Sequence, residues 1–169
     1  MKKFLIIIAC ILCLLSVYIF FRTKPPSPAA KIHYHAGFLV YVDGVLADFS
    51  NIDYMNVDYC SNPHKTETQA EIQIGKAHLH DNVGDVVHVH RPGAVWGDLF
   101  TNIRYTFPAG KPLMGYINGQ SAPDILIRPI RPYDSVIFVV GDGTNVDLTK
   151  TVSKTHMMDI EKHSEGCSV

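Results

Sequence analysis

Histidines dominate the residues of this chain that could perform chemistry. Six of the nine occur in three His-x-His pairs, namely His33 and His35, His78 and His80, and His88 and His90. Random placement of nine histidines in 169 residues would give fewer than one such pair on average. Because a β-strand directs residues i and i+2 to one face, each pair sets two imidazoles side by side. This spacing suits metal ligands, and neutral imidazole binds Zn, Cu, Ni and Fe.

The central stretch "HLHDNVGDVVHVH" predicts a β-hairpin that carries two of the three pairs. A three-residue loop of Asn82, Val83 and Gly84, with Gly84 left-handed, would pair His78 with His88 and keep four imidazoles on one face. A two-residue turn at Val83 and Gly84 would separate the pairs, and valine is poorly suited to a positive φ. We therefore expect the three-residue loop.

The simplest metal site uses three or four imidazoles of this hairpin, joined by one from the first pair. The candidate ligands are His78, His80, His88, His90, His33 and His35. Three histidines and an open position would resemble a catalytic zinc site, whereas a filled coordination sphere indicates storage, transfer or structure. Asp81 and Asp85 are interpreted as outer partners that accept the second imidazole N–H, or as residues that only shape the turn. A polar sheet face without metal is the alternative for the whole cluster.

The remaining reactive residues carry weaker signals. His64, His156 and His163 are interpreted as ordinary polar residues, and Met157 with Met158 forms only one short sulfur cluster. Cys60 and Cys167 are the cysteines outside the N-terminal apolar run, and they could form a disulfide in an oxidising compartment. The chain has no glycine-rich phosphate loop, no Gly-x-Ser-x-Gly elbow and no Cys-x-x-Cys, so neither a nucleotide nor a thiol enzyme is indicated.

Strands and one helix must position these histidines. The stretch "IHYHAGFLVYVDGVLADFS" predicts a hairpin with an Asp43-Gly44 turn, and "PLMGYINGQSA" predicts a strand that ends in an Asn118-Gly119 turn. The apolar spacing of "GAVWGDLFTNIRYTF" predicts the main core helix, and "DSVIFVVGDG" predicts a buried strand. We expect a loop with a short helical turn over residues 51–68, and "DILIRPIRP" at most as an edge strand because of its prolines.

The N-terminus, "MKKFLIIIACILCLLSVYIFFRTK", has an apolar run over residues 4–21 that is just long enough to cross a hydrocarbon core. We predict a retained single-pass anchor over residues 1–24, and a cleaved signal peptide is the alternative. A proline-rich linker follows over 25–31, then a histidine-rich domain over 32–142 and a helix with a disordered tail over 143–169. The signal-like layout places the domain outside the cytoplasmic membrane.

The charge and the distribution of basic residues limit the kinds of partner that we expect. The formal net charge is −1, and the basic residues are scattered without the clustering that a nucleic-acid surface needs. We therefore expect a membrane contact through residues 4–21 and a metal ion as partner, and no nucleic acid.

Three motifs resemble those of a poorly characterised group of small, exported or membrane-anchored bacterial and archaeal proteins. They are "HYHAGFLVYVDGVLADFS", "HLHDNVGDVVHVH" and "WGDLF", within residues 33–140. The order hairpin, helix, strand, strand also resembles the β-grasp, or ubiquitin-like, fold, in which a mixed sheet wraps one helix. The resemblance implies an α+β fold with the histidine-rich hairpin as an insertion, and it implies location more than activity. The segment "DILIRPI" departs from the β-grasp plan.

Three functions are compatible with these features. The first is a membrane-anchored, extracytoplasmic protein that binds Zn or Cu through the histidine hairpin. The second is a small zinc hydrolase or hydratase, which needs a three-histidine site with an open position. The third is a β-grasp interaction module whose histidines respond to external pH. The sequence shows no convincing general acid or base besides the candidate ligands, which favours binding over catalysis.

Overall fold

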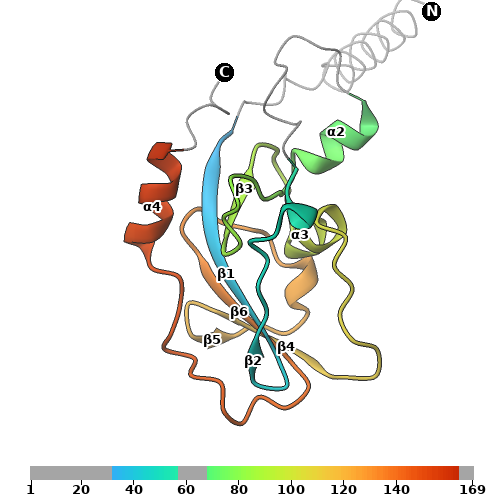
Figure 1. Cartoon of the computed structure of the whole chain (residues 1–169), viewed down its shortest axis with the longest axis vertical. Coiled ribbons are helices and arrows are strands. Elements are labelled where there is room, and N and C mark those ends of the chain that lie inside the picture. The colour runs from blue at the N-terminus through green and yellow to red at the C-terminus, as the bar shows by residue number, and fades with distance from the viewer. Residues whose placement is uncertain (1–31, 57–67, 164–169) are drawn as a thin grey trace, which may run out of the picture. The chain divides into compact units, whose positions relative to one another are not determined.

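A six-stranded mixed sheet is the framework of the protein. The structure is a computed structural model that describes residues 32–56 and 68–163, and its strand order is β2-β1-β6-β4-β5, with β3 also paired to β1 (Figure 1). The strands are β1 (Tyr34–Val42), β2 (Val45–Leu46), β3 (Val86–Val89), β4 (Leu113–Ile117), β5 (Gln120–Ser121) and β6 (Ser135–Val140). β1 and β6 are parallel, and every other pair is antiparallel. The predicted α+β class with a mixed sheet is confirmed.

Two tight turns form where the sequence predicts them. Asp43 and Gly44 join β1 to β2 with φ values of 49° and 79°, and Asn118 and Gly119 join β4 to β5 with φ values of 50° and 79°. A two-residue turn with positive φ at both positions matches the twist of the strands that it joins, and Asp-Gly and Asn-Gly tolerate it best.

One edge of β1 is shared by two short strands. β2 has only two residues and pairs with the end of β1, at Tyr41 and Val42. The first half of β1 is therefore open to β3, which pairs from Tyr34 to Gly37. This arrangement brings the strand that carries His88 next to the strand that carries His35.

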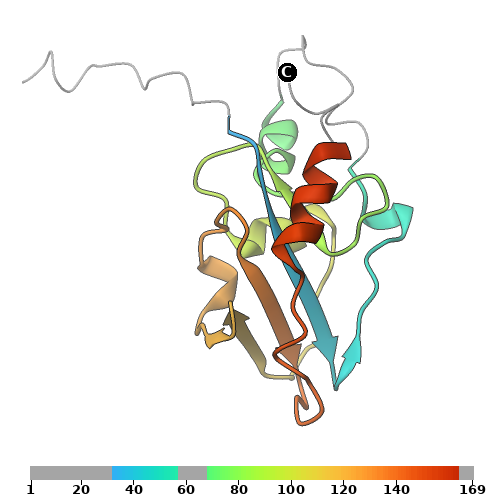
Figure 2. The ribbon, with the colours of Figure 1, turned by 90° about the vertical axis from the view of Figure 1, so that its left-hand side faces the viewer.

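Helices cover the two faces of the sheet. They are the 3-10 helices η1 (Ile52–Tyr54) and η3 (Ile125–Ile127) and the α-helices α2 (Gln69–Ile74), α3 (Trp96–Asn102) and α4 (Lys154–His163). α3 buries Trp96, whose ring centroid lies 6.2 Å from that of Phe38 in β1. On the other face of β1, Met157 of α4 packs with Val86 and Val152, and α4 crosses in front of β1 in Figure 2.

The helical content differs from expectation in three places. The predicted main helix ends at Asn102, because Arg104 takes a left-handed φ of 57°, although Tyr105 and Phe107 still pack against the core. α4 is longer than α3, so the expectation of one main helix near residues 93–107 is wrong. The sequence analysis missed α2, whose capping box joins Thr68 and Glu71.

The segment "DILIRPIRP" forms η3 instead of an edge strand. Asp124 adopts a left-handed φ of 56° just before it, and Ile125 turns into the core. Pro129 contributes only an isolated bridge to Val95, as expected for a residue without a backbone N–H.

Within the described ranges, no helix has the length and apolar character needed to cross a membrane. Several predicted features lie outside the described residues: the anchor over residues 1–24, the linker, the tail, and both Cys60 and Cys167.

The packing of α4 predicts unequal effects for two adjacent methionines. Met157 is 1% exposed and Met158 is 40% exposed. We expect Met157→Ala to lower the free energy of unfolding by about 2–3 kcal/mol through loss of buried contacts, and Met158→Ala by less than about 0.5 kcal/mol. Chemical denaturation measures both, and equal effects would show that α4 does not pack on the sheet through Met157.

Candidate metal centre

The three His-x-His pairs lie on three neighbouring segments. β3 is in the middle: His88 pairs with His35 of β1 on one side and forms an isolated antiparallel bridge with His78 on the other. The bridge has both backbone hydrogen bonds, with N–O distances of 3.0 and 2.9 Å between His78 and His88. Residues directly opposite in antiparallel strands point to the same face, so His35, His88 and His78 form a row across the sheet.

The histidines occupy the sheet face opposite α3. Their neighbours along the chain, Ala36, Leu79 and Val87 among them, belong to the core cluster that contains Trp96. Side chains alternate between faces along a strand. The imidazoles therefore point away from that core, to the face on which α4 packs.

The loop that joins the second and third pairs has the predicted register but a different conformation. His78 is opposite His88, as expected. The left-handed residues are Asp81 and Asn82, with φ values of 57° and 58°, and Gly84 is not left-handed. Gly84 is instead needed because a Cβ there would overlap the backbone of Phe49 and Ser50.

His88 is the centre of the cluster. Its Nδ1 lies 2.7 Å from Nε2 of His35 and 2.9 Å from Nε2 of His80. Its ring centroid lies 5.9 Å from that of His78 and 6.1 Å from that of His33. One imidazole thus contacts the rings of four others.

The last two histidines extend the cluster beyond the strand ends. His33 and His90 stack with ring centroids 4.5 Å apart and an interplanar angle of 11°. The His90 centroid is also 5.3 Å from that of His78, and the His33 centroid is 4.7 Å from that of His35. All six predicted ligand histidines therefore lie in one group.

Most of this group is removed from water. His35, His78 and His88 are 0% exposed and His80 is 6% exposed, whereas His33 and His90 are partly buried. Within the described part of the chain, Nε2 of His33, Nδ1 of His35 and Nε2 of His88 are buried and have no hydrogen-bond partner. Burying a polar atom in this way costs free energy.

Burial favours the neutral form of five imidazoles, those of His33, His35, His78, His88 and His90. It lowers the pKa of His35 to about 4 and the pKa values of His78 and His90 to about 3, and neighbouring histidines add to each effect. Burial also lowers the pKa values of His88 and His33, and at His33 the Glu161 carboxylate of α4 partly opposes it. Neutral imidazole has the lone pair that a metal ion needs.

Two outer partners orient the second pair. The Nδ1–H of His80 donates to the Asp81 carboxylate at 2.7 Å, and the Nδ1–H of His78 donates to the backbone carbonyl of Ile74 at 3.1 Å. Both rings therefore present the Nε2 lone pair to the cluster. The Asp85 carboxylate instead accepts a hydrogen bond from Nε2 of His156, at 3.2 Å.

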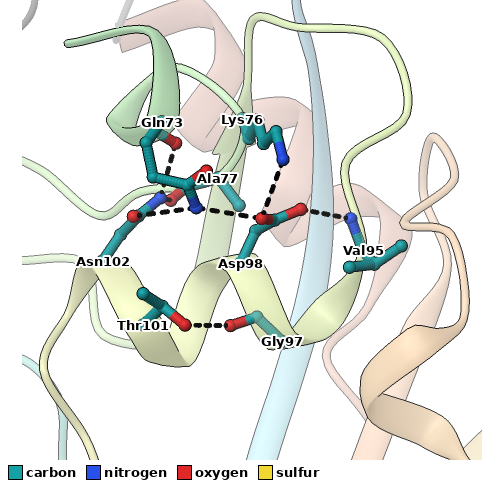
Figure 3. Close-up of polar contacts among 8 residues, drawn as sticks. All are labelled: Gln73, Lys76, Ala77, Val95, Gly97, Asp98, Thr101 and Asn102. Carbon is teal, nitrogen blue, oxygen red and sulfur yellow. Dashed lines mark hydrogen bonds and ion pairs between the residues drawn. The ribbon is translucent and has the colours of Figure 1, made fainter. Parts of the chain in front are cut away.

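A polar network holds the segment that leads into His78. The Asn102 side chain of α3 donates to the backbone carbonyls of Gln73 and Ala77, at 2.9 and 2.7 Å (Figure 3). The Asp98 carboxylate accepts hydrogen bonds from Gln73 at 2.9 Å and from Lys76 at 3.2 Å. These contacts tie the end of α2 to α3. Asp98 also caps α3, by accepting a hydrogen bond from the Val95 backbone N–H.

Two groups that act on the histidine cluster could not be found from the sequence, a backbone carbonyl and the carboxylate of a distant helix. The Ile74 carbonyl and Glu161 of α4 carry no motif that relates them to a His-x-His pair. Among the other histidines, His156 and His163 contact Asp85 and the Asp159 carbonyl and lie apart from the cluster, as expected. His64 lies outside the described residues.

The lowered pKa values predict that the metal-free protein loses stability in acid. His35 and His78 have an ordinary pKa of 6.5 when unfolded and about 4 and 3 when folded. Between these values the unfolded chain binds more protons, so the stabilisation is complete above pH 6.5 and is lost as the pH falls. Each such histidine contributes a slope of up to about 1.4 kcal/mol per pH unit.

Chemical denaturation of the metal-free chain at pH 7.5, 6.5 and 5.5 measures this effect. Besides the histidines, charged side chains near the cluster are Asp81 beside His80, Glu161 near His33 and Arg91 near His90. A free energy of unfolding that stayed constant or rose toward pH 5.5 would contradict the burial of neutral imidazoles.

No family model, curated protein or solved structure matches this chain. The observation that bears on function is therefore the histidine cluster. His33, His35 and His88 offer nitrogen atoms that all lie within 4.8 Å of one another. These three imidazoles are close enough to hold a metal ion.

Proposed function

We propose that this protein binds a transition-metal ion, Zn or Cu, through the histidine cluster. The observation that carries the proposal is the convergence of three ring nitrogens: Nδ1 of His88 with Nε2 of His35 and Nε2 of His80. In the neutral ring of His80 the lone pair is on Nε2, because Nδ1 donates to Asp81. The single hydrogen that Nδ1 of His88 can carry serves two neighbours poorly, whereas one metal ion would accept a lone pair from all three rings.

The donor set limits the choice of metal. All six candidate donors are imidazoles, which suit Zn and Cu(II), whereas Cu(I) prefers sulfur ligands. Tetrahedral ligands at metal–nitrogen distances of about 2.0–2.1 Å lie roughly 3.3 Å apart. The separations of 2.7 and 2.9 Å from Nδ1 of His88 are shorter than this, so these rings would move outward to admit an ion.

The burial of the cluster favours metal binding or storage over hydrolysis. A catalytic zinc site keeps a coordination position open to substrate, but four of the six imidazoles here are almost fully buried. A cavity of about 490 Å³ lies near β5 and is lined by Arg128, Arg131 and Asp134, among others, and by none of the histidines.

We further propose a β-grasp core on a membrane anchor. The core assignment is supported by the parallel pair β1 and β6 at the centre of the sheet. β2 lies beside β1, and β4 and β5 follow beside β6. The apolar run over residues 4–21 supports a single-pass anchor, and its signal-like layout supports an extracytoplasmic domain. Protease protection of spheroplasts tests the location: accessible domain is the expected result.

Elemental analysis of the purified full chain tests the metal proposal. We expect at least one Zn or Cu ion per chain after exposure to either metal. A variant with His78, His80, His88 and His90 changed to alanine should lose it. The matched control changes His156 and His163, which lie outside the cluster, and should keep its metal. Equally low metal in all three proteins would show that the cluster is a polar sheet face.

The two loop aspartates provide a second test. Asp81 contacts the metal-facing ring of His80, whereas Asp85 contacts His156. We expect Asp81→Asn to weaken metal binding by about 10–100-fold, because the carboxylate orients the ring and raises its basicity. Asp85→Asn should leave the affinity within about twofold. Competition with a chromophoric chelator measures both, and equal losses would contradict an outer role for Asp81.

A further inference from the structure

We propose that the cluster holds two metal ions, bridged by the imidazole ring of His88. This inference rests on the proposed metal binding and adds the number of ions and the shared ligand. Six imidazoles exceed the four ligands of one tetrahedral ion. They gather around His88, whose ring centroid lies 3.7–6.1 Å from those of His33, His35, His78 and His80.

The first ion would lie at Nδ1 of His88. Nε2 of His35 and Nε2 of His80 approach this nitrogen, at 2.7 and 2.9 Å. Asp81 fixes the tautomer of His80 so that its Nε2 is available. This set gives one ion three imidazole ligands.

The second ion would lie at Nε2 of His88. The lone pairs of the two nitrogens of an imidazole ring diverge, so one ion cannot bind both. Nε2 of His88 is buried and has no hydrogen-bond partner in the described part of the chain, and Nε2 of His33 is in the same situation. Both buried nitrogen atoms could therefore bind the second ion.

His33, His78 and His90 would complete the second set. The ligand atoms of His33, His35 and His88 lie within 4.8 Å of one another, so with two ions His35 binds the first, His33 the second, and His88 both. The ring centroids of His33 and His78 lie 6.1 and 5.9 Å from that of His88, and His90 lies 4.5 Å from His33 and 5.3 Å from His78. Two imidazoles on one ion have centroids roughly 4.5–6.5 Å apart, given metal–nitrogen distances of about 2.0–2.1 Å. The Ile74 carbonyl leaves Nε2 of His78 as the donor atom.

The bridge requires the release of one proton. Neutral His88 has one N–H and one lone pair, so it binds one ion as it stands. When the second ion binds the other nitrogen, the N–H bond breaks, its proton passes to solvent, and the ring stays as an imidazolate with a metal–nitrogen bond at each end. Asp81 and Glu161, both close to cluster histidines, offset part of the added positive charge.

Copper loading of the full chain tests this inference. We expect two Cu(II) ions per chain, with a low-temperature electron paramagnetic resonance signal that integrates to far fewer spins than copper ions. An imidazolate bridge couples the two unpaired electrons antiferromagnetically. One copper per chain with full spin intensity would overturn the bridge and leave the proposed metal binding intact. Two coppers with full, uncoupled intensity would also overturn the bridge. No bound copper would overturn the bridge, and neither copper nor zinc bound would overturn both proposals.

Variants separate the two sets of ligands. His80→Ala, at the edge of the first set, should bind one copper with full spin intensity, because the second set remains. Changing both His33 and His90 to alanine should give the converse loss of the second ion, because only His78 and His88 of that set remain. The control His156→Ala should keep two coupled ions. Circular dichroism checks the fold of each variant. Coupling that persisted in either His80→Ala or the double variant of His33 and His90 would overturn the assignment.

Discussion

The pairing of β3 between β1 and the segment around His78 is the constraint on which the candidate site depends. His88 is opposite His35 on one side and His78 on the other. A shift of one residue in either register would turn a His-x-His pair to the opposite face. The imidazoles therefore meet because backbone hydrogen bonds place them in register, and the side chains need little freedom of their own.

The same pairing places the imidazole rings on strands whose opposite face belongs to the apolar core. Along each of the three segments, the residues between the histidines are fully buried on the other face, as Ala36, Leu79 and Val87 are. This apolar face stabilises the strands by burial from water. This burial offsets the free-energy cost of the neutral imidazoles on the opposite face of the sheet, whose hydrogen bonding is incomplete. A cluster of this kind is consistent with a functional site maintained at the expense of local stability.

Much of this arrangement could be predicted from local patterns in the sequence. The Asp43-Gly44 and Asn118-Gly119 turns follow from turn chemistry, and the buried strand at Ser135–Val140 follows from a continuous apolar run. The His78–His88 register was also predicted, although the loop that produces it has a different conformation. The participation of His33 and His35 depended on long-range pairing, which the sequence only suggested. The end of α3 at Asn102 was not predictable, because Tyr105 and Phe107 continue the apolar pattern from an extended segment. Glu161 and the Ile74 carbonyl reach the cluster through tertiary packing, which leaves no local signal.

The shortness of β2 has a consequence for how this fold can vary. β2 covers only the end of β1, so without β3 four residues of β1 would present unpaired N–H and C=O groups at a sheet edge. Exposed edges of this kind invite pairing with other chains. The histidine segment is therefore also the edge protection of the sheet. Substitutions can change its ligands one at a time. Deletion of the whole segment would remove the candidate metal site and also expose an edge of the sheet that favours aggregation.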